Sequence, residues 1–181
     1  MEDRFGAFTV LPAKDHPELM AAPVFSLLSS LPDAGWVGVT EIDPSLSDTV
    51  AFCERYGVGV ELAANCVVLE AKRAEKTWFA ACVILGSTRI DVNGVARKTL
   101  DARKASFAPM ERAVLETGME YGAITPVGLP PSWPILVDAS VAAAERVIVG
   151  SGIRKSKLII PGSLLVTLRG ASVLAQLAKR A

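Results

Sequence analysis

The sequence is poor in the side chains that hydrolases and metalloproteins most often use. Histidine occurs once, as His16, and cysteine three times, as Cys53, Cys66 and Cys82. A Ser-His-Asp or Cys-His triad would have to use His16, and the chain has no G-x-S-x-G motif that would present a serine. An odd number of cysteines without a C-x-x-C pair argues against both a disulfide framework and a zinc site. We therefore expect neither an imidazole-based triad nor a metal centre.

Long apolar runs are also absent. The longest strongly apolar stretch covers residues 79–85, far short of the roughly 20 residues that a membrane helix needs. The first residues, Met-Glu-Asp-Arg-Phe, lack the basic and apolar regions of a signal peptide. Aromatic residues make up 6% of the chain, too few to predict a base-stacking platform. With 181 residues, 51% of them hydrophobic, the chain is expected to be one soluble, cytoplasmic domain without a membrane partner.

The net charge is zero, which argues against a strongly basic nucleic-acid binder and against DNA as a partner. The two halves differ, because residues 1–90 carry 7 basic and 12 acidic residues and residues 91–181 carry 12 and 7. Two basic clusters lie in the second half. They are Arg97, Lys98, Arg103 and Lys104, and Arg154, Lys155 and Lys157. Each can hold phosphate groups through charge-assisted hydrogen bonds, or can be ordinary solvated surface.

Hydrophobic periodicity predicts a mixture of helices and strands. Helices are expected at 16–31, from Ser45 or Ser47 to about Tyr56, from about Asp91 to residue 100, from Pro109 to Gly118, and at 163–168. Strands are expected at 36–42, 66–71, 77–85, 105–107, 134–138, 146–150 and 157–160, with a hairpin formed by 66–71 and 77–85. The apolar tail 171–178 is expected to dock. Strict βαβ alternation is missing, so a mixed-sheet α+β domain is favoured over a doubly wound one.

Two glycine-containing segments stand out between the predicted elements. Residues 147–152 place a G-x-G after a strand, as a dinucleotide site does, but the third glycine of that motif is replaced by Lys155 and no acidic residue follows about 20 positions later. No nucleotide cofactor is therefore expected, and these glycines provide either a tight turn or a close approach to a ligand. The loop at residues 122–128 can aim several backbone N–H groups at one point, or can be a plain connection.

An ordered set of segments resembles the YbaK/EbsC/ProX family, which shares the editing domain inserted in bacterial prolyl-tRNA synthetases. The resemblance covers roughly residues 47–169. The segments that carry it are Asn65–Glu70, Arg89–Asp91, Thr117–Gly128, Leu136–Asp138, Val149–Gly152 and Leu158–Gly162. It implies a mixed α/β domain at residues 46–181, with a central, largely antiparallel curved sheet flanked by helices. Residues 1–45 are then expected to be an N-terminal extension packed on that core.

The resemblance also implies a function. Family members release a wrongly attached small amino acid from the 3′ end of tRNA, acting in trans and without a metal or other cofactor. The implied partner is the acceptor end of an aminoacyl-tRNA, with an aminoacyl-tRNA synthetase as a further possible partner. The usual catalytic elements are a lysine on the first hairpin strand and a G-x-x-x-P loop that orients the substrate carbonyl and the attacking water.

The family pattern assigns roles to particular residues of this chain. Gly122, Thr125 and Pro126 match the loop, and the implied substrate-binding residues are Asp138, Gly150, Ser151 and Gly152. The lysine is replaced by Asn65, which can form hydrogen bonds but cannot neutralise a phosphate. Two hypotheses follow. Either another cation, Lys104 or Arg103, supplies the charge for deacylation, or the chain is an inactive module that binds the tRNA 3′ end or an aminoacyl-adenosine-like ligand.

Overall fold

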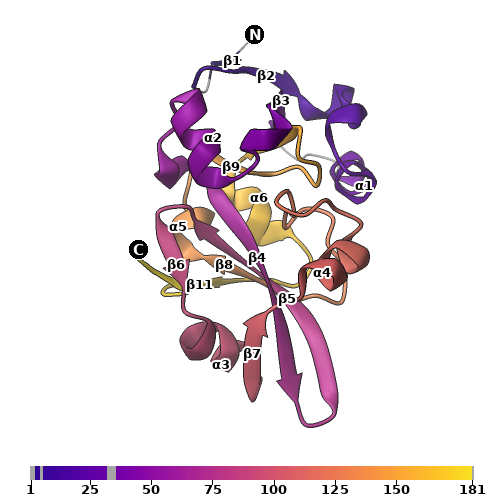
Figure 1. Cartoon of the computed structure of the whole chain (residues 1–181), viewed down its shortest axis with the longest axis vertical. Helices are drawn as coiled ribbons and strands as arrows, with labels where there is room; N and C mark the ends of the chain where they lie inside the picture. Colours follow the sequence, from indigo (N-terminus) through magenta and orange to yellow (C-terminus); the bar gives the residue numbers. More distant parts are fainter. Residues whose placement is uncertain (1–2, 5, 32–35, 181) are drawn as a thin grey trace.

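The computed structural model describes residues 3–4, 6–31 and 36–180, and these form a mixed α+β domain (Figure 1). The helices are α1 (Ala22–Ser30), α2 (Thr49–Tyr56), α3 (Arg97–Thr99), α4 (Met110–Thr117), α5 (Ala139–Ala142) and α6 (Gly162–Thr167). The strands are β1 (Asp3–Arg4), β2 (Thr9–Pro12), β3 (Gly38–Glu41), β4 (Ala64–Arg73), β5 (Lys76–Leu85), β6 (Thr88–Ile90), β7 (Lys104–Phe107), β8 (Ile135–Asp138), β9 (Val147–Gly150), β10 (Ser156–Ile160), β11 (Ala171–Leu174) and β12 (Ala178–Arg180). The predicted fold class is confirmed.

The strands are divided between two main sheets, rather than joined in one central sheet. The first sheet has the order β1-β2-β3-β10-β9 and is antiparallel throughout. The second has the order β11-β8-β5-β4-β7, in which β8 runs parallel to both β5 and β11. A small ribbon pairs β12 with β6. The sheets meet at an isolated parallel bridge between Ala63 and Ile148, next to the start of β4 and within β9.

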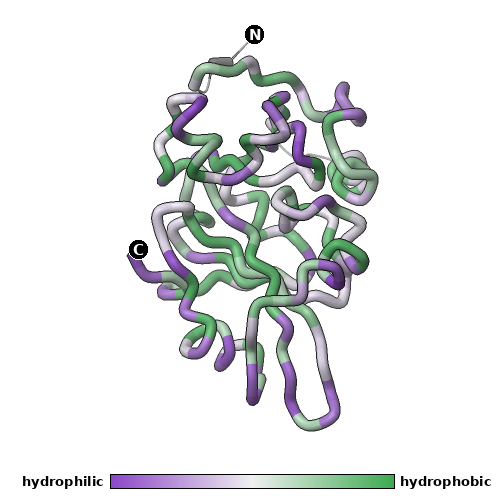
Figure 2. The backbone as a smooth tube through the Cα atoms, in the orientation of Figure 1, coloured by the Kyte–Doolittle hydropathy of each residue, from purple (hydrophilic) through white to green (hydrophobic). Residues whose placement is uncertain are grey.

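The core lies between the two sheets and on their outer faces. The largest cluster is shared by both sheets and includes Val39 and Leu158 from the first and Val83 and Val137 from the second. Alternate residues of the first sheet pack against Phe52 of α2, because side chains on a strand point to opposite faces in turn. The outer face of the second sheet is covered in the same way by the segment around α3. Figure 2 shows apolar segments at the centre and hydrophilic residues at the tip of the β4–β5 hairpin.

The described part of residues 1–45 belongs to this architecture. β3 pairs with both β2 and β10, so it is an internal strand of the first sheet. Val24 of α1 is fully buried in the shared core. The predicted strand at 36–42 is thus β3.

Two predicted helix starts are corrected. The helix expected from residue 16 begins at Ala22, and residues 13–15 and 17–19 form 3-10 turns instead. Pro23 lies in the first turn of α1, where a missing N–H costs nothing, so it starts the helix rather than kinking it. The next helix is capped by Asp48, not by Ser45 or Ser47: its carboxylate accepts hydrogen bonds from the backbone N–H groups of Val50 and Ala51.

Most other predicted elements are found close to their expected positions. The hairpin is longer than expected, because backbone pairing continues through the polar residues to Arg73 and Lys76. α4 ends at Gly118, which adopts a left-handed conformation with φ +66°, as a glycine C-cap does. The apolar tail docks as β11, which adds a parallel strand beside β8. The helix expected from Asp91 is a π-helical turn at Val92–Ala96 followed by α3, with the Asp91 carboxylate accepting from the N–H of Gly94.

Candidate functional site

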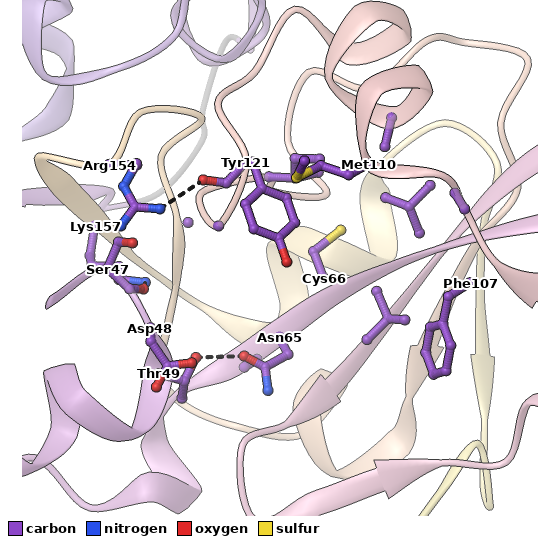
Figure 3. A pocket seen from close by; sticks show the side chains of 18 of the residues that line it. Ser47, Asp48, Thr49, Asn65, Cys66, Phe107, Met110, Tyr121, Arg154 and Lys157 are labelled. Carbon is purple, nitrogen blue, oxygen red and sulfur yellow. Dashed lines mark hydrogen bonds between the residues drawn. The ribbon is translucent and has the colours of Figure 1, made fainter. Parts of the chain in front are cut away.

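A pocket of about 630 Å³ opens where β4 and β9 separate beyond the Ala63–Ile148 bridge (Figure 3). One wall is the start of β4, from Ala64 to Val68, and the opposite wall is Gly150 at the end of β9. The remaining lining comes from the segment before α2, from α2 itself, from the end of β7, from α4, from the loop after α4, and from the β9–β10 turn and β10. These lining residues are Ser45, Ser47, Asp48, Thr49, Phe107, Ala108, Met110, Ala113, Tyr121, Gly122, Ile124, Arg154 and Lys157.

The β4 wall of the pocket is a strand edge. β7 pairs with β4 only from Leu69 to Lys72, and the N–H of Ala108 bonds the carbonyl oxygen of Val68 at 2.9 Å. In an antiparallel ladder, alternate residues direct both backbone groups to the same side. The N–H and C=O of Cys66 therefore face the pocket, as those of Val68 face β7. The Cys66 thiol also lines the pocket, and burial raises its pKa, so it is not a thiolate nucleophile.

Asn65 is held in the pocket by α2. The Oγ1 hydroxyl of Thr49, the first residue of that helix, donates to Oδ1 of Asn65 at 2.5 Å (Figure 3). Asp48 fixes this end of α2 through its cap bonds. Because the amide oxygen of Asn65 already accepts from Thr49, its amide nitrogen is the atom that can donate to a ligand.

Lys157 brings a buried positive charge to the pocket. Its Nζ donates to the carbonyl oxygen of Ser47 at 2.7 Å and lies 5.6 Å from the centre of the Phe52 ring. Burial lowers the pKa of Lys157 to about 8, while the nearby Asp48 and Cys53 act in the opposite direction. Lys157 stands directly opposite Gly150 in the β9–β10 ladder, and this register brings it into the pocket.

Arg154 is the second cation that lines the pocket. Its guanidinium donates to the carbonyl oxygens of Tyr121 at 3.2 Å and Pro44 at 3.1 Å. Its backbone N–H donates to Oε2 of Glu120 at 2.6 Å. Over the described ranges 3–4, 6–31 and 36–180, neither Arg154 nor Lys157 forms an ion pair. The pocket therefore presents positive charge that no carboxylate neutralises by contact.

The loop after α4 approaches the cations through Gly122. This residue has φ +80°, and a Cβ added to it would lie 3.0 Å from Nη1 of Arg154 and 3.4 Å from Oγ of Ser47. The neighbouring Ala123 accepts a hydrogen bond from the N–H of Gly152 at 2.8 Å. A Cβ at Gly150 would collide with the carbonyl oxygen of Ala123. The glycines thus let the loop and the β9–β10 turn pack backbone against backbone.

Three of the residues to which the family pattern assigns a role line the pocket together: Asn65, Gly122 and Gly150. Thr125 and Pro126 follow Gly122 but are buried and are not among its lining residues. The Thr125 hydroxyl has no hydrogen-bond partner within the described part of the chain.

The other predicted site residues lie outside the pocket. Ser151 and Gly152 support the turn after β9, where Ser151 Oγ bonds Ser156 Oγ at 2.7 Å. Asp138 caps α5 through Ser140 and accepts from the N–H of Ala178 at 3.1 Å. Lys104 is exposed on β7 and is paired in register with Lys72.

Sequence reasoning found the basic cluster that contains Arg154 and Lys157 but gave it no catalytic role. The signal was its position just after the G-x-G turn. Only the pairing of Lys157 with Gly150 shows that the Lys157 side chain shares a pocket with Asn65. Within the same described ranges, no group of three or more His, Cys, Asp or Glu side chains is placed to hold a metal ion. No helix of the described chain is both long and apolar enough to cross a membrane.

Comparison with known proteins identifies the family of the chain. The family of aminoacyl-tRNA editing domains matches residues 43–168, more than half of the chain. The chain therefore belongs to the aminoacyl-tRNA editing domain family. A search of curated proteins gives no match.

Solved structures share the fold at low sequence identity. A candidate trans-editing enzyme for prolyl-tRNA synthetase superimposes with a TM-score of 0.72 at 20% identity, over 89% of this chain and 97% of that one. A scaffold protein used for grafting linear epitopes superimposes with a TM-score of 0.71 at 18% identity, over 90% of this chain and 100% of that one. The hypothetical protein APE2540 superimposes with a TM-score of 0.68 at 21% identity, over 78% of this chain and 90% of that one. The first two matches extend beyond the 43–168 segment, so their fold includes much of the region before α2.

Proposed function

We propose that this protein is a stand-alone aminoacyl-tRNA deacylase, which hydrolyses the ester of a mischarged tRNA in trans. The observation that carries the proposal is one pocket in which the Asn65 amide, the Gly122 loop and the unpaired charges of Arg154 and Lys157 converge. An ester needs little activation, so positioning water and stabilising the oxyanion can supply much of the acceleration. Such a mechanism does not need a histidine.

The reaction is a simple hydrolysis. Water attacks the carbonyl carbon, the bond between that carbon and the ribose oxygen breaks, and the ribose hydroxyl takes the proton that water loses. The products are a free amino acid and an uncharged tRNA. Asn65 orients the substrate through its amide nitrogen, and the backbone around Gly122 lies against the carbonyl. Gly150 forms the wall opposite β4, while the buried residues Thr125 and Pro126 hold the loop that contains Gly122.

Lys157, together with Arg154, supplies the positive charge that Asn65 lacks. Lys157 is the better candidate than Lys104 or Arg103, since neither of these lines the pocket. Its Nζ is buried and forms no ion pair in the described structure. Burial deprives the ammonium group of solvation by water, and an anionic group of the substrate would compensate for that loss. Asp138, Ser151 and Gly152 then serve the site indirectly, by holding α5 and the turn after β9.

A charge-swap experiment tests this assignment. We expect Lys157→Met to lower kcat/KM for deacylation by about 10- to 100-fold, the range for losing a hydrogen bond to a charged group. Adding Asn65→Lys to that variant returns a lysine to the same pocket and should recover at least part of the loss. Lys104→Met is the matched control and should leave kcat/KM unchanged. A large effect of Lys104→Met with none of Lys157→Met would reverse the assignment.

The function itself is tested with a panel of mischarged tRNAs that carry alanine, serine, cysteine, threonine or proline. Rapid loss of the ester from one or two members would establish trans-editing and identify the substrate. The enzyme that supplies such a substrate is a synthetase that attaches the wrong amino acid, which makes a synthetase a reasonable partner. No loss from any member would contradict the deacylase proposal.

A second candidate function rests on Asn65 itself. Without a charge at this position, the chain can be a binding module that retains the tRNA 3′ end or an aminoacyl-adenosine-like ligand without hydrolysing it. This candidate predicts saturable tRNA retention on a filter without ester loss, and some activity after Asn65→Lys. If the wild-type protein is already active and Asn65→Lys lowers that activity, the binding-only function is excluded.

A further inference from the structure

Three large apolar side chains are exposed at the pocket mouth. Phe107 at the end of β7 is 66% exposed, Met110 at the start of α4 is 50% exposed, and Tyr121 in the loop after α4 is 60% exposed. All three line the pocket (Figure 3). We call them the aromatic rim. The chain has few aromatic residues, yet its fold gathers two of them beside one opening. Single exposed apolar residues are normal, whereas a cluster at a pocket marks a contact surface.

The backbones that carry the rim are firmly held. Ala108, next to Phe107, donates to Val68 at 2.9 Å, and the Tyr121 carbonyl accepts from Arg154 at 3.2 Å. Met110 begins α4, whose first turn is closed by the bond from Ala113 to Pro109 at 3.0 Å. The backbone positions of the rim are therefore fixed, while its side chains stay open to solvent. An aromatic side chain has only two rotatable χ angles, so it loses little conformational entropy when a flat partner stacks on it.

The charge beside the rim indicates what that partner is. The pocket that the rim borders contains Arg154 and Lys157 together with one carboxylate, that of Asp48, and neither cation forms an ion pair in the described structure. A matching ligand carries flat apolar faces along a negatively charged backbone. Unpaired nucleotides have both features, and their bases stack on aromatic side chains in single-strand binding sites.

We propose that Phe107 and Tyr121 stack the nucleobases of the unpaired RNA strand that leads into the pocket, with Met110 adding apolar contact. The inference rests on the proposed function, because it takes the acceptor end of tRNA as the strand. It adds a base-binding site outside the hydrolytic centre. Stacking tolerates any base, so this site strengthens binding of the strand without choosing the amino acid.

The test compares two uncharged RNAs, an intact tRNA and the same tRNA lacking its last three nucleotides. Filter retention gives the Kd of each for the wild type, Phe107→Ala, Tyr121→Ala and Phe107→Trp. Leu115→Ala is the matched control, because Leu115 is 81% exposed on α4 but does not line the pocket. Since the altered side chains are exposed, all variants should keep the wild-type melting curve.

We expect each alanine variant to weaken binding of the intact tRNA by about 5- to 100-fold, the range for losing one stacked base. Binding of the shortened tRNA should not change, Phe107→Trp should bind like the wild type, and Leu115→Ala should have no effect. Equal binding of the two tRNAs by the wild type would overturn the inference, even if the mischarged-tRNA panel supports deacylation. A concentration-dependent dimer that Phe107→Ala dissociates would also overturn it, by assigning the rim to a second copy of this chain.

Discussion

At the scale of single residues, the candidate site contains one glycine and one lysine in unusual surroundings. Gly122 has a positive φ and lies against Arg154, so both its backbone conformation and the space around it disfavour a side chain. Lys157 is buried, its Nζ donates a hydrogen bond to the carbonyl oxygen of Ser47, and burial lowers its pKa to about 8. Each residue gives a prediction that separates its role at the site from its role in the fold.

Gly122→Ala is expected to slow deacylation more than tenfold without unfolding the domain. The added Cβ would lie 3.0 Å from Nη1 of Arg154, so the guanidinium must give way, and a φ of +80° is a strained conformation for alanine. Single-turnover ester hydrolysis measures the rate. Gly118→Ala is a matched control, because Gly118 also has a positive φ but has no atom within 4 Å of its Cβ position. Equal rates for the two variants would remove Gly122 from the mechanism.

The lowered pKa of Lys157 predicts a change in tRNA binding near pH 8. Burial favours the neutral amine, so the positive charge is present below about pH 8 and is lost as the pH rises through that value. Affinity for uncharged tRNA should therefore fall between pH 7 and pH 9 in the wild type. Lys157→Met should bind more weakly at pH 7 and lack this step. The same pH dependence in both proteins would contradict the assignment.

The sign for stability is opposite to the sign for binding. The unfolded chain holds the Lys157 proton up to about pH 10.5, whereas the folded chain releases it near pH 8. Between these values the unfolded state binds more protons, so the Lys157 contribution to the free energy of unfolding rises with pH. The neighbours of Lys157 also affect its pKa, because Asp48 and Cys53 favour the charged amine and Arg154 disfavours it. The pH at which Lys157 loses its proton therefore depends on all of these side chains.

At the scale of elements, the first turn of α2 links helix formation to the site. Asp48 caps the helix, Thr49 starts it, and Thr49 fixes the amide of Asn65 across the pocket. The same segment provides the Ser47 carbonyl that accepts from Lys157. Fraying at this end would release both polar groups of the site together.

Replacing the cap gives a prediction for this element. Asp48→Ala should lower the free energy of unfolding by about 1 kcal/mol, because two backbone N–H groups lose their acceptor. Urea denaturation measures the change. Asp48→Asn keeps a side-chain acceptor and should retain most of the stability. If the alanine and asparagine variants unfold at the same urea concentration, the cap does not stabilise α2.

At the scale of the whole molecule, the two sheets are the two walls of the pocket. β4 belongs to one sheet and β9 to the other, and a parallel bridge between Ala63, just before β4, and Ile148 of β9 joins them where the pocket begins. The family match begins at residue 43, but β3, which precedes it, pairs with β10, the strand that carries Lys157. The first 45 residues are therefore expected to be needed for the site as well as for the fold.

A chain starting at residue 46 should not fold cooperatively. Its loss of β3 would leave one edge of β10 unpaired and would expose Leu158 and Ile160, which are fully buried in the intact protein. Far-UV circular dichroism during urea denaturation compares the shortened and full-length chains. A sharp unfolding transition in the shortened chain would instead support an independent domain at residues 46–181.

The sequence alone determined the features that depend on near neighbours. The β4–β5 hairpin, the α4 helix with its Gly118 cap and the turn after β9 all rest on residues a few positions apart, so local pattern and turn chemistry were sufficient to predict them. The ordered motifs also identified the family, and three of the residues that they single out, Asn65, Gly122 and Gly150, line the pocket. The two corrected helix starts were also local choices: α1 begins at Ala22, with Pro23 in its first turn, and Asp48 caps α2 in place of Ser45 or Ser47.

Only the tertiary structure decided which charges and rings join that site. Lys104 and Lys157 are both strand lysines in basic clusters, but only Lys157 is opposite Gly150, in a register set by pairing between distant segments. Phe107 and Tyr121 line the same pocket because β7, α4 and the loop after α4 lie beside the free edge of β4. The register of strand pairing and the position at which the two sheets separate depend on contacts between distant parts of the chain. The residues next to a given position in the sequence do not determine either of them.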